Sequence, residues 1–264
     1  MDGKLILMRH GQSEWTRSDI NRFAGWVDIP LSEWGKQQAR QAGQLIQNAD
    51  LKPDCVFTSL LRRSIESSNL ALDMMNRLWV PVQRSWRLNE RHYGAFQGQT
   101  RPDMLAQYGQ RHFGIYRRSY DVAPPALSVD SPYWQGQDSR YSAPFLDHLD
   151  QKDPACITAE SLSDVLMRFL PYWQERILPL LASGQTVFVV THGSVVRATI
   201  KMLEQLSDHD IQYINVPTGI PLVYRFVKTT HSSQLLETIE PGRYLDPVAA
   251  KSGIAHVEAL GQGE

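Results

Sequence analysis

The segment Leu5-Ile6-Leu7-Met8-Arg9-His10-Gly11 decides the expected fold. Its four successive apolar residues predict a short strand that is covered on both faces, because a half-exposed strand would alternate apolar and polar side chains. A cation, an imidazole and a glycine follow the strand directly. Ligands of open α/β sheets bind just beyond the carboxyl ends of the strands, so Arg9 and His10 stand where chemistry is expected.

The same pattern recurs late in the chain. Thr186–Thr191 predicts a second buried strand, and it runs into His192-Gly193-Ser194 and then a helix. One histidine after a strand is weak evidence, because a packed or exposed histidine is the more common explanation. Two such strand ends, the first with an arginine, favour a shared site. If the strands are adjacent and parallel, both imidazoles project from the same edge of the sheet.

The elements between these strands alternate. The expected elements are a helix opened by Ser32, a strand over 54–59, a helix over 61–75, a strand over 80–87, a helix opened by the Ser161/Asp164 capping box and kinked at Pro171, a short helix from Ser207 and a strand over 222–226. This alternation predicts an α/β fold, a three-layer α/β/α sandwich with a mainly parallel sheet.

The length of 264 residues fits either one large α/β domain or two small ones, and we expect a single domain spanning 1–264. The Pro-rich segment 121–158 lacks periodicity, and we interpret it as a cap over the site, since long irregular loops are usually functional. The polar tail 241–264 is expected to be either mobile or folded over the site.

Composition excludes several functions. A formal net charge of -1 argues against a general nucleic-acid or membrane-surface binder. No apolar run approaches the ~18 residues of a membrane span, and no signal-like segment opens the chain. Cys55 and Cys156 have no metal-binding or redox spacing. We therefore expect a cytoplasmic protein with two free thiols.

The basic residues are strongly biased towards arginine, with 20 Arg and 7 Lys. Between Arg84 and Arg118 seven arginines face only two acids, an excess of five positive charges in a chain that is nearly neutral overall. A solvated basic face is the alternative, but such faces normally mix lysine with arginine. Because the planar guanidinium grips phosphate or carboxylate through two hydrogen bonds, this bias favours an anion pocket.

These residues favour phosphoryl transfer through a histidine. A metal ion would be repelled by the arginines, and no HExxH, Walker or GxGxxG motif is present, so neither a metal nor a nucleotide cofactor is expected. Neutral imidazole is a nucleophile, and nearby arginines keep His10 uncharged and bind the phosphoryl oxygens. His192 is the candidate partner of those oxygens, and Glu90 is the candidate proton donor and acceptor.

At this point the chain resembles a known family. Leu7–Ser13 is similar to the RHG signature of the histidine phosphatase superfamily, and the resemblance to its cofactor-dependent phosphoglycerate mutase branch runs nearly the whole chain. The mutase-like blocks are Arg22–Asp28, Phe57–Arg63, Trp86–Gly94, Arg117–Asp121 and Pro217–Pro221. Trp86–Gly94, WRLNERHYG, is the most specific of them and separates mutases from plain phosphatases.

The resemblance implies a phosphoglycerate mutase-like fold and interconversion of 3- and 2-phosphoglycerate, primed by 2,3-bisphosphoglycerate without a metal. It assigns catalytic roles to His10, Glu90, His192, Arg9 and Arg63, and substrate contacts to Ser13, Thr16, Ala24, Gly25, Arg63, Tyr93, Arg101, Arg117, Arg118, Gly193 and Ser194. The partner is a small phosphorylated carboxylate. A homodimer or homotetramer is expected by resemblance only.

The chain departs from the family pattern at several substrate contacts. Thr16 replaces an Asn, for which Asn21 is a candidate substitute, while Ala24, Arg101 and Ser194 replace Ser, Lys and Asn. The phosphoryl-transfer residues are intact, so the chemistry is predicted more firmly than the substrate. The alternatives are a phosphatase that hydrolyses a small phosphomonoester and a non-enzymatic paralogue that binds anionic metabolites.

Overall fold

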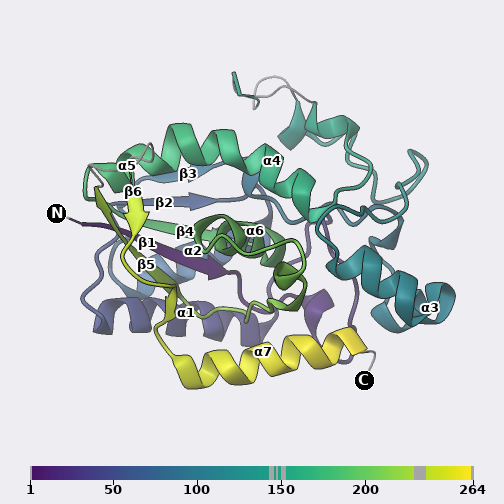
Figure 1. The fold of residues 1–264 in the computed structure, drawn as a ribbon, viewed down its shortest axis with the longest axis horizontal. Helices are drawn as coiled ribbons and strands as arrows, with labels where there is room; N and C mark the ends of the chain where they lie inside the picture. Colours follow the sequence, from purple (N-terminus) through teal and green to yellow (C-terminus); the bar gives the residue numbers. More distant parts are fainter. Residues whose placement is uncertain (1, 143–145, 147, 150–152, 229–235, 263–264) are drawn as a thin grey trace.

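The computed structural model describes residues 2–142, 146, 148–149, 153–228 and 236–262 (Figure 1). A seven-stranded sheet forms its centre, with the order β3-β2-β4-β1-β5-β6, and β7 also pairs with β5. The strands are β1 Gly3–Arg9, β2 Cys55–Thr58, β3 Val82–Arg84, β4 Thr186–Thr191, β5 Leu222–Lys228, β6 Leu236–Thr238 and β7 Arg243–Tyr244.

The strands that carry the two His-Gly ends are neighbours. β1 and β4 pair in parallel, with Arg9 opposite Thr191. β2 pairs in parallel with both β3 and β4, whereas β5 is antiparallel to β1. Because parallel strands end at one edge of a sheet, His10 and His192 project from the same edge, as the sequence predicts.

Helices cover both faces of the sheet. On one face, α1 Glu33–Asn48 and α2 Arg62–Met74 contribute Ile46 and Leu72 to a core that contains Ile6 of β1. On the other, α4 Leu162–Tyr172, α5 Leu178–Ala182 and α6 Gly193–Leu203 pack around Leu5 and Leu7. Alternate residues of β1 thus enter two different cores, and the predicted three-layer α/β/α architecture is confirmed.

Local signals place several helix boundaries. The Ser32 hydroxyl accepts a hydrogen bond from the Gly35 amide at the start of α1, and Ser161 and Asp164 form the predicted capping box of α4. Pro171 lies inside α4, and a π-helical turn, Trp173–Ile177, follows it before α5 begins. The predicted irregularity at Pro171 therefore takes the form of a π turn.

Short 3-10 helices fill the connections. They are Glu14–Thr16, Trp86–Leu88, Gly94–Phe96, Ser139–Tyr141, Pro154–Cys156 and Asp210–Tyr213. The predicted strand over 80–87 is therefore too long, because β3 ends at Arg84 and the chain turns into the 3-10 helix Trp86–Leu88. The Ser85 hydroxyl starts that turn by accepting the Arg87 amide.

Two helices lie where the sequence analysis assigned none. α3 Arg101–Arg118 buries only Met104 and Phe113 and is interrupted at Gly109, which has a φ of 70°. α7 Pro247–Gln262 lies within the predicted polar tail and runs beside α1 (Figure 1). Neither has the continuous apolar stripe that reveals an amphipathic helix.

The 121–158 segment is irregular where it is described. Tyr141 stacks on Trp26, with ring centroids 4.9 Å apart, and Gln135 bonds His92. The segment thus supports the chain around residues 86–92, and its role as a cap stays a prediction. Within the described residues, no helix is long and apolar enough to cross a membrane.

Candidate active site

The two strand-end histidines form the centre of the site. Their ring centroids lie 4.9 Å apart in an edge-to-face arrangement. His10 Nδ1 lies 2.6 Å from the carbonyl oxygen of Gly11, which can only accept a hydrogen bond. Nδ1 therefore carries the proton, and Nε2 keeps a lone pair. This tautomer makes Nε2 the nucleophilic atom.

Arg63, in the first turn of α2, lies against that lone pair. Its Nε is 3.2 Å from His10 Nε2, and its terminal nitrogens donate to the carbonyls of Gly25 and Val27 at 2.7 and 2.9 Å. The loop after β1 thus holds the guanidinium beside the nucleophile. The Asp28 carboxylate accepts the Arg62 amide at 2.7 Å and so supplies an anion at the α2 N-terminus.

His192 is held from behind by Ser59. Ser59 Oγ accepts the Leu61 amide at 3.1 Å and lies 2.8 Å from His192 Nε2. With one lone pair of Oγ occupied, the simplest assignment has the hydroxyl donate to Nε2, which leaves the proton on Nδ1. His192 Nδ1 is buried without a hydrogen-bond partner among the described residues. It is an available donor for a phosphoryl oxygen.

Both imidazoles are uncharged at neutral pH. Burial lowers the pKa of His10 well below its usual value, and the positive charges of Arg63 and Arg9 lower it further. Burial followed by the Arg63 charge does the same to the pKa of His192. A histidine that stays neutral retains the lone pair that attack on phosphorus requires.

Glu90 lies next to the histidines on the loop after the 3-10 helix Trp86–Leu88. Its Oε1 accepts the amides of Arg91 and Ser194 at 2.8 and 3.0 Å, which fixes the side chain. A methyl group built on Gly193 would be 3.7 Å from Oε2. The second carboxylate oxygen therefore faces the start of α6 and is free of those two amides.

Arg9 closes this side of the site. One of its terminal nitrogens donates to the Val216 carbonyl at 2.8 Å, across 207 residues of chain. Its Nε is buried without a partner among the described residues. Since a buried unpaired N–H is costly, this atom points to an anionic ligand that completes it.

A cavity of about 80 Å³ opens in front of His10. It is lined by Arg9, His10, Thr16, Phe23, Ala24, Gly25, Arg63, Glu90, Tyr93, Arg101, Arg117, Arg118, Gly193, Ser194, Arg197, Ile214, Asn215, Val216 and Val257. Nearly all predicted site residues are thus brought together. No described residue of 121–158 is among them.

Two predicted residues stand apart from the cavity wall. Ser13 is buried, and its hydroxyl lies 3.1 Å from that of Thr16, so the structure does not place it in direct reach of a ligand. His192 lies fully buried beside His10. The candidate substitute Asn21 does not line the cavity either, and its Oδ1 accepts a hydrogen bond from Arg101 at 2.7 Å.

The cavity is strongly basic. Of the residues that the structure describes, six arginines line it, against the single carboxylate of Glu90. Burial lowers the pKa of Arg101 to about 10, and burial with the nearby Arg118 lowers the pKa of Arg117 to about 8. The lowered pKa values mean that burial and mutual repulsion make the charged form of these guanidinium groups less favourable. A bound polyanion would offset that repulsion, so the cavity favours polyanion binding.

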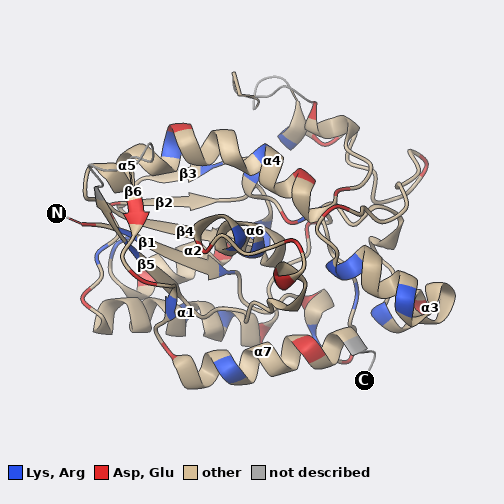
Figure 2. Cartoon of the chain, viewed as in Figure 1, with Lys and Arg blue, Asp and Glu red and all other residues tan. Residues whose placement is uncertain are grey.

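The arginine-rich segment is only partly directed at this cavity. Arg101, Arg117 and Arg118 belong to α3 and line it, whereas Arg84 is exposed on β3. Figure 2 shows the basic positions of α3 and α6 in blue. The sequence therefore pointed to arginines that line the cavity but could not separate them from the rest of the segment.

Arg197 was missed by the sequence analysis. It lies on α6, four residues after Gly193, and lines the cavity while donating to the Ile211 carbonyl at 2.7 Å. The spacing of four on a helix after a His-Gly strand end was the available signal. Val257 of α7 had no such signal.

The donor set does not suit a metal. Among the described residues, no group of three or more His, Cys, Asp or Glu side chains is placed to hold an ion. The remaining polar groups of the cavity are mostly guanidinium groups, which repel cations. The site is therefore built for anions.

Comparison with known proteins agrees with this geometry. Residues 5–133 match the model of the histidine phosphatase superfamily (branch 1). The chain is 45% identical over 263 residues to the 2,3-bisphosphoglycerate-dependent phosphoglycerate mutase of Bifidobacterium longum, with 99% of this chain and 100% of that protein covered. The chain belongs to the phosphoglycerate mutase family. The phosphoglycerate mutase of Candida albicans is 46% identical over 260 residues, covering 98% of both chains.

The fold of this mutase family member is similar to that of several solved structures. A mycobacterial glucosyl-3-phosphoglycerate phosphatase has a TM-score of 0.63 at 22% identity, covering 92% of this chain and 96% of that one. At this identity the likeness concerns the fold alone.

Proposed function

We propose that this protein interconverts 3-phosphoglycerate and 2-phosphoglycerate by passing a phosphoryl group through His10. The observation that carries the proposal is the His10 ring: Nδ1 is bound to the Gly11 carbonyl and Nε2 is unprotonated beside Arg63. A neutral nucleophile within a ring of guanidinium groups suits attack on a phosphate ester and little else.

The reaction begins with a phosphorylated His10. A hydroxyl of the bound phosphoglycerate attacks phosphorus, the Nε2–P bond breaks, and Glu90 takes the hydroxyl proton. In the return step, Nε2 attacks the other phosphate, and Glu90 gives the proton back to the departing alkoxide. The net result is a moved phosphoryl group and an unchanged enzyme.

The guanidinium groups have two tasks in this scheme. Arg9 Nε, Arg63 and His192 Nδ1 bind the oxygens of the transferring phosphoryl group, where charge develops. Arg101, Arg117 and Arg118 bind the remaining carboxylate and phosphate, as do Tyr93 and Thr16 at the cavity wall. A carboxylate and two phosphates carry about five negative charges near neutral pH, a match for six arginines.

2,3-Bisphosphoglycerate is the proposed primer, which supplies the phosphoryl group that loads His10. The names of several relatives state this dependence. The residues present fit it, because the partnerless Arg9 Nε and the costly charges of Arg101 and Arg117 call for a polyanion. The small phosphorylated carboxylate is thus both primer and substrate class.

Intact-mass measurement tests the proposal. Incubation with 2,3-bisphosphoglycerate should add one phosphoryl group. 3-Phosphoglycerate should accept that group to give 2,3-bisphosphoglycerate, and continued turnover should form 2-phosphoglycerate as His10 is phosphorylated again. His10→Ala should show neither event. Release of inorganic phosphate without 2-phosphoglycerate would indicate a phosphatase, and binding without any mass gain would indicate a paralogue that has lost catalysis.

A further inference from the structure

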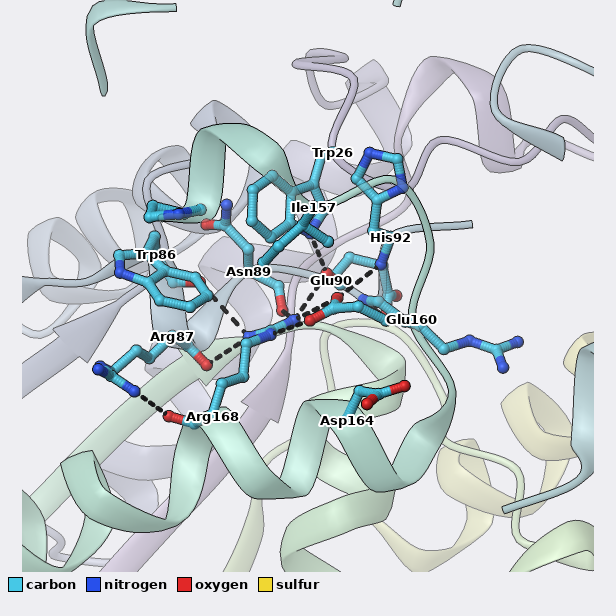
Figure 3. A network of polar contacts seen from close by, with 12 residues as sticks. Trp26, Trp86, Arg87, Asn89, Glu90, His92, Ile157, Glu160, Asp164 and Arg168 are labelled. Atoms are coloured by element: carbon cyan, nitrogen blue, oxygen red, sulfur yellow. Dashed lines mark hydrogen bonds and ion pairs between the residues drawn. The ribbon is translucent and has the colours of Figure 1, made fainter. Parts of the chain in front are cut away.

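The chain around Glu90 is held by a buried ion pair that lies outside the cavity. Arg168 of α4 and Glu160, which precedes that helix, are 7% and 3% exposed. Their side chains meet twice, with Arg168 Nε 2.6 Å and a terminal nitrogen 3.1 Å from the two carboxylate oxygens of Glu160 (Figure 3).

The guanidinium of Arg168 also binds the backbone that leads to Glu90. Its terminal nitrogens donate to the carbonyls of Arg87 at 2.6 Å, Asn89 at 2.9 Å and Glu90 at 3.0 Å. These carbonyls lie at the end of a 3-10 helix and in the loop after it, outside the regular backbone hydrogen bonding of a strand or a longer helix. The planar guanidinium, with its five N–H donors, serves the three carbonyls together.

Glu160 completes the restraint on the other side of Glu90. Its carboxylate accepts the His92 amide at 2.8 Å, and its own amide donates to the His92 carbonyl at 2.9 Å. The indole of Trp26 adds a hydrogen bond of 2.6 Å to the Glu90 carbonyl (Figure 3). The backbone is thus fixed before, at and after the proposed acid/base.

We infer that Arg168 and Glu160 are positioning residues that set the location of the Glu90 carboxylate. The inference rests on the proposed role of Glu90. It follows from the direction of the contacts: the pair holds the backbone of residues 87–92, while the Arg91 and Ser194 amides hold Glu90 Oε1. Because the backbone of Glu90 and its Oε1 are both held, the position of Oε2 is fixed as well. Neither Arg168 nor Glu160 lines the cavity.

The choice of leaving group distinguishes a displaced Glu90 carboxylate from a general loss of order in the active site. Transfer from an alkyl phosphate to His10 needs a proton for the alkoxide, whereas transfer from 2,4-dinitrophenyl phosphate releases a stable phenolate and needs none. Displacement of an acid/base by about 1 Å costs on the order of a hundredfold in rate. The defect should therefore appear with the alkyl donor only.

The experiment measures loading of His10 by rapid-quench intact mass with both donors, in the full-length protein. Arg168→Lys keeps the charge but cannot span three carbonyls, so we expect about a 10- to 100-fold slower rate with 2,3-bisphosphoglycerate. The rate with 2,4-dinitrophenyl phosphate should stay within about threefold of wild type on the same argument. The KM for 3-phosphoglycerate should not change.

Two further variants keep the test decisive. Trp26→Phe removes the indole donor without unpairing a charge, and it should show the same donor dependence in milder form if Arg168→Lys does not fold. Arg77→Lys is the matched control, because Arg77 also binds a backbone carbonyl, that of Pro53 at 2.9 Å, away from this loop. It should leave both rates unchanged.

Glu90→Gln distinguishes failure of the inference from failure of the proposed role. This variant should be slow with the alkyl donor but not with 2,4-dinitrophenyl phosphate. Adding Arg168→Lys should cause no further loss of rate, because both substitutions impair the same proton transfer. Equal slowing of both donors in the Arg168 and Trp26 variants would overturn the positioning role. Equal slowing of both donors in Glu90→Gln would instead overturn the acid/base role.

Discussion

Gly193→Ala should separate activity from stability at the start of α6. A methyl group built on Gly193 lies 3.6 Å from Arg9 Nε and 3.7 Å from Glu90 Oε2, ordinary van der Waals distances, so the folded protein accommodates it. The same methyl group occupies the space between the partnerless Arg9 Nε and the proposed acid/base. A phosphoryl oxygen that must bind Arg9 Nε at about 2.8 Å is thereby excluded.

The structure sets the size of both effects. Loss of one hydrogen bond to a charged group costs about 1.5–3 kcal/mol, which corresponds to about a 10- to 150-fold fall in kcat/KM. The free energy of unfolding should instead rise by about 0.4–1 kcal/mol, because alanine restricts the unfolded chain more than glycine. Activity and stability thus move in opposite directions.

A coupled assay of 2-phosphoglycerate formation and urea denaturation measure the two quantities. Gly114→Ala is the matched control, since a methyl group there meets no atom within 4 Å. It should change stability by a similar amount and leave kcat/KM at the wild-type value. A Gly193→Ala enzyme with wild-type kcat/KM would refute the assignment of Arg9 Nε as an anion contact.

Three more predictions follow from the charges of the site. Because burial and the charges of Arg63 and Arg9 lower the pKa of His10, the folded protein leaves it neutral while the unfolded chain protonates it below pH ~6.5, so the free energy of unfolding decreases as the pH falls through that value. Urea titrations of His10→Asn should lack this contribution, and parallel pH curves would contradict it. Arg117→Met should raise the KM for 3-phosphoglycerate about tenfold or more without lowering the melting temperature, because it removes a buried charge whose pKa burial and Arg118 lower to about 8; a large loss of stability would show that Arg117 is structural. Chelation by EDTA should leave the rate unchanged, because the described residues offer no metal-ligand cluster, and recovery of lost activity with Mg²⁺ would oppose this.

Local sequence signals determined the framework. The apolar runs of β1 and β4, the Ser32 cap of α1 and the Ser161/Asp164 capping box are properties of a few adjacent residues, and the structure has them where they were predicted. The predicted strand over 80–87 ran past the end of β3, because the role of Ser85 as the cap of the following 3-10 helix could not be recognised in the sequence. α3 and α7 were missed because their buried residues are too few and too scattered to show a helical period.

The sequence also identified most of the cavity wall, because each His-Gly strand end and each motif arginine is readable by itself. The contacts that join distant parts of the chain at this site cannot be read from the sequence in the same way. Arg9 binds a carbonyl 207 residues away, and Arg168 reaches the Glu90 carbonyl from 78 residues away. Arg197 joins the cavity only because α6 starts at the shared edge of β1 and β4.

The amino-acid order by itself thus determined which groups are available: a strand-end nucleophile, a second imidazole, one carboxylate and an excess of arginines. The tertiary structure decided their protonation and placement. His10 is neutral because packing buries it against Arg63, and Glu90 is fixed because α4 supplies Arg168 to the carbonyls of the loop that carries it. Burial and long-range hydrogen bonding arise only when distant segments pack, so no local pattern encodes them.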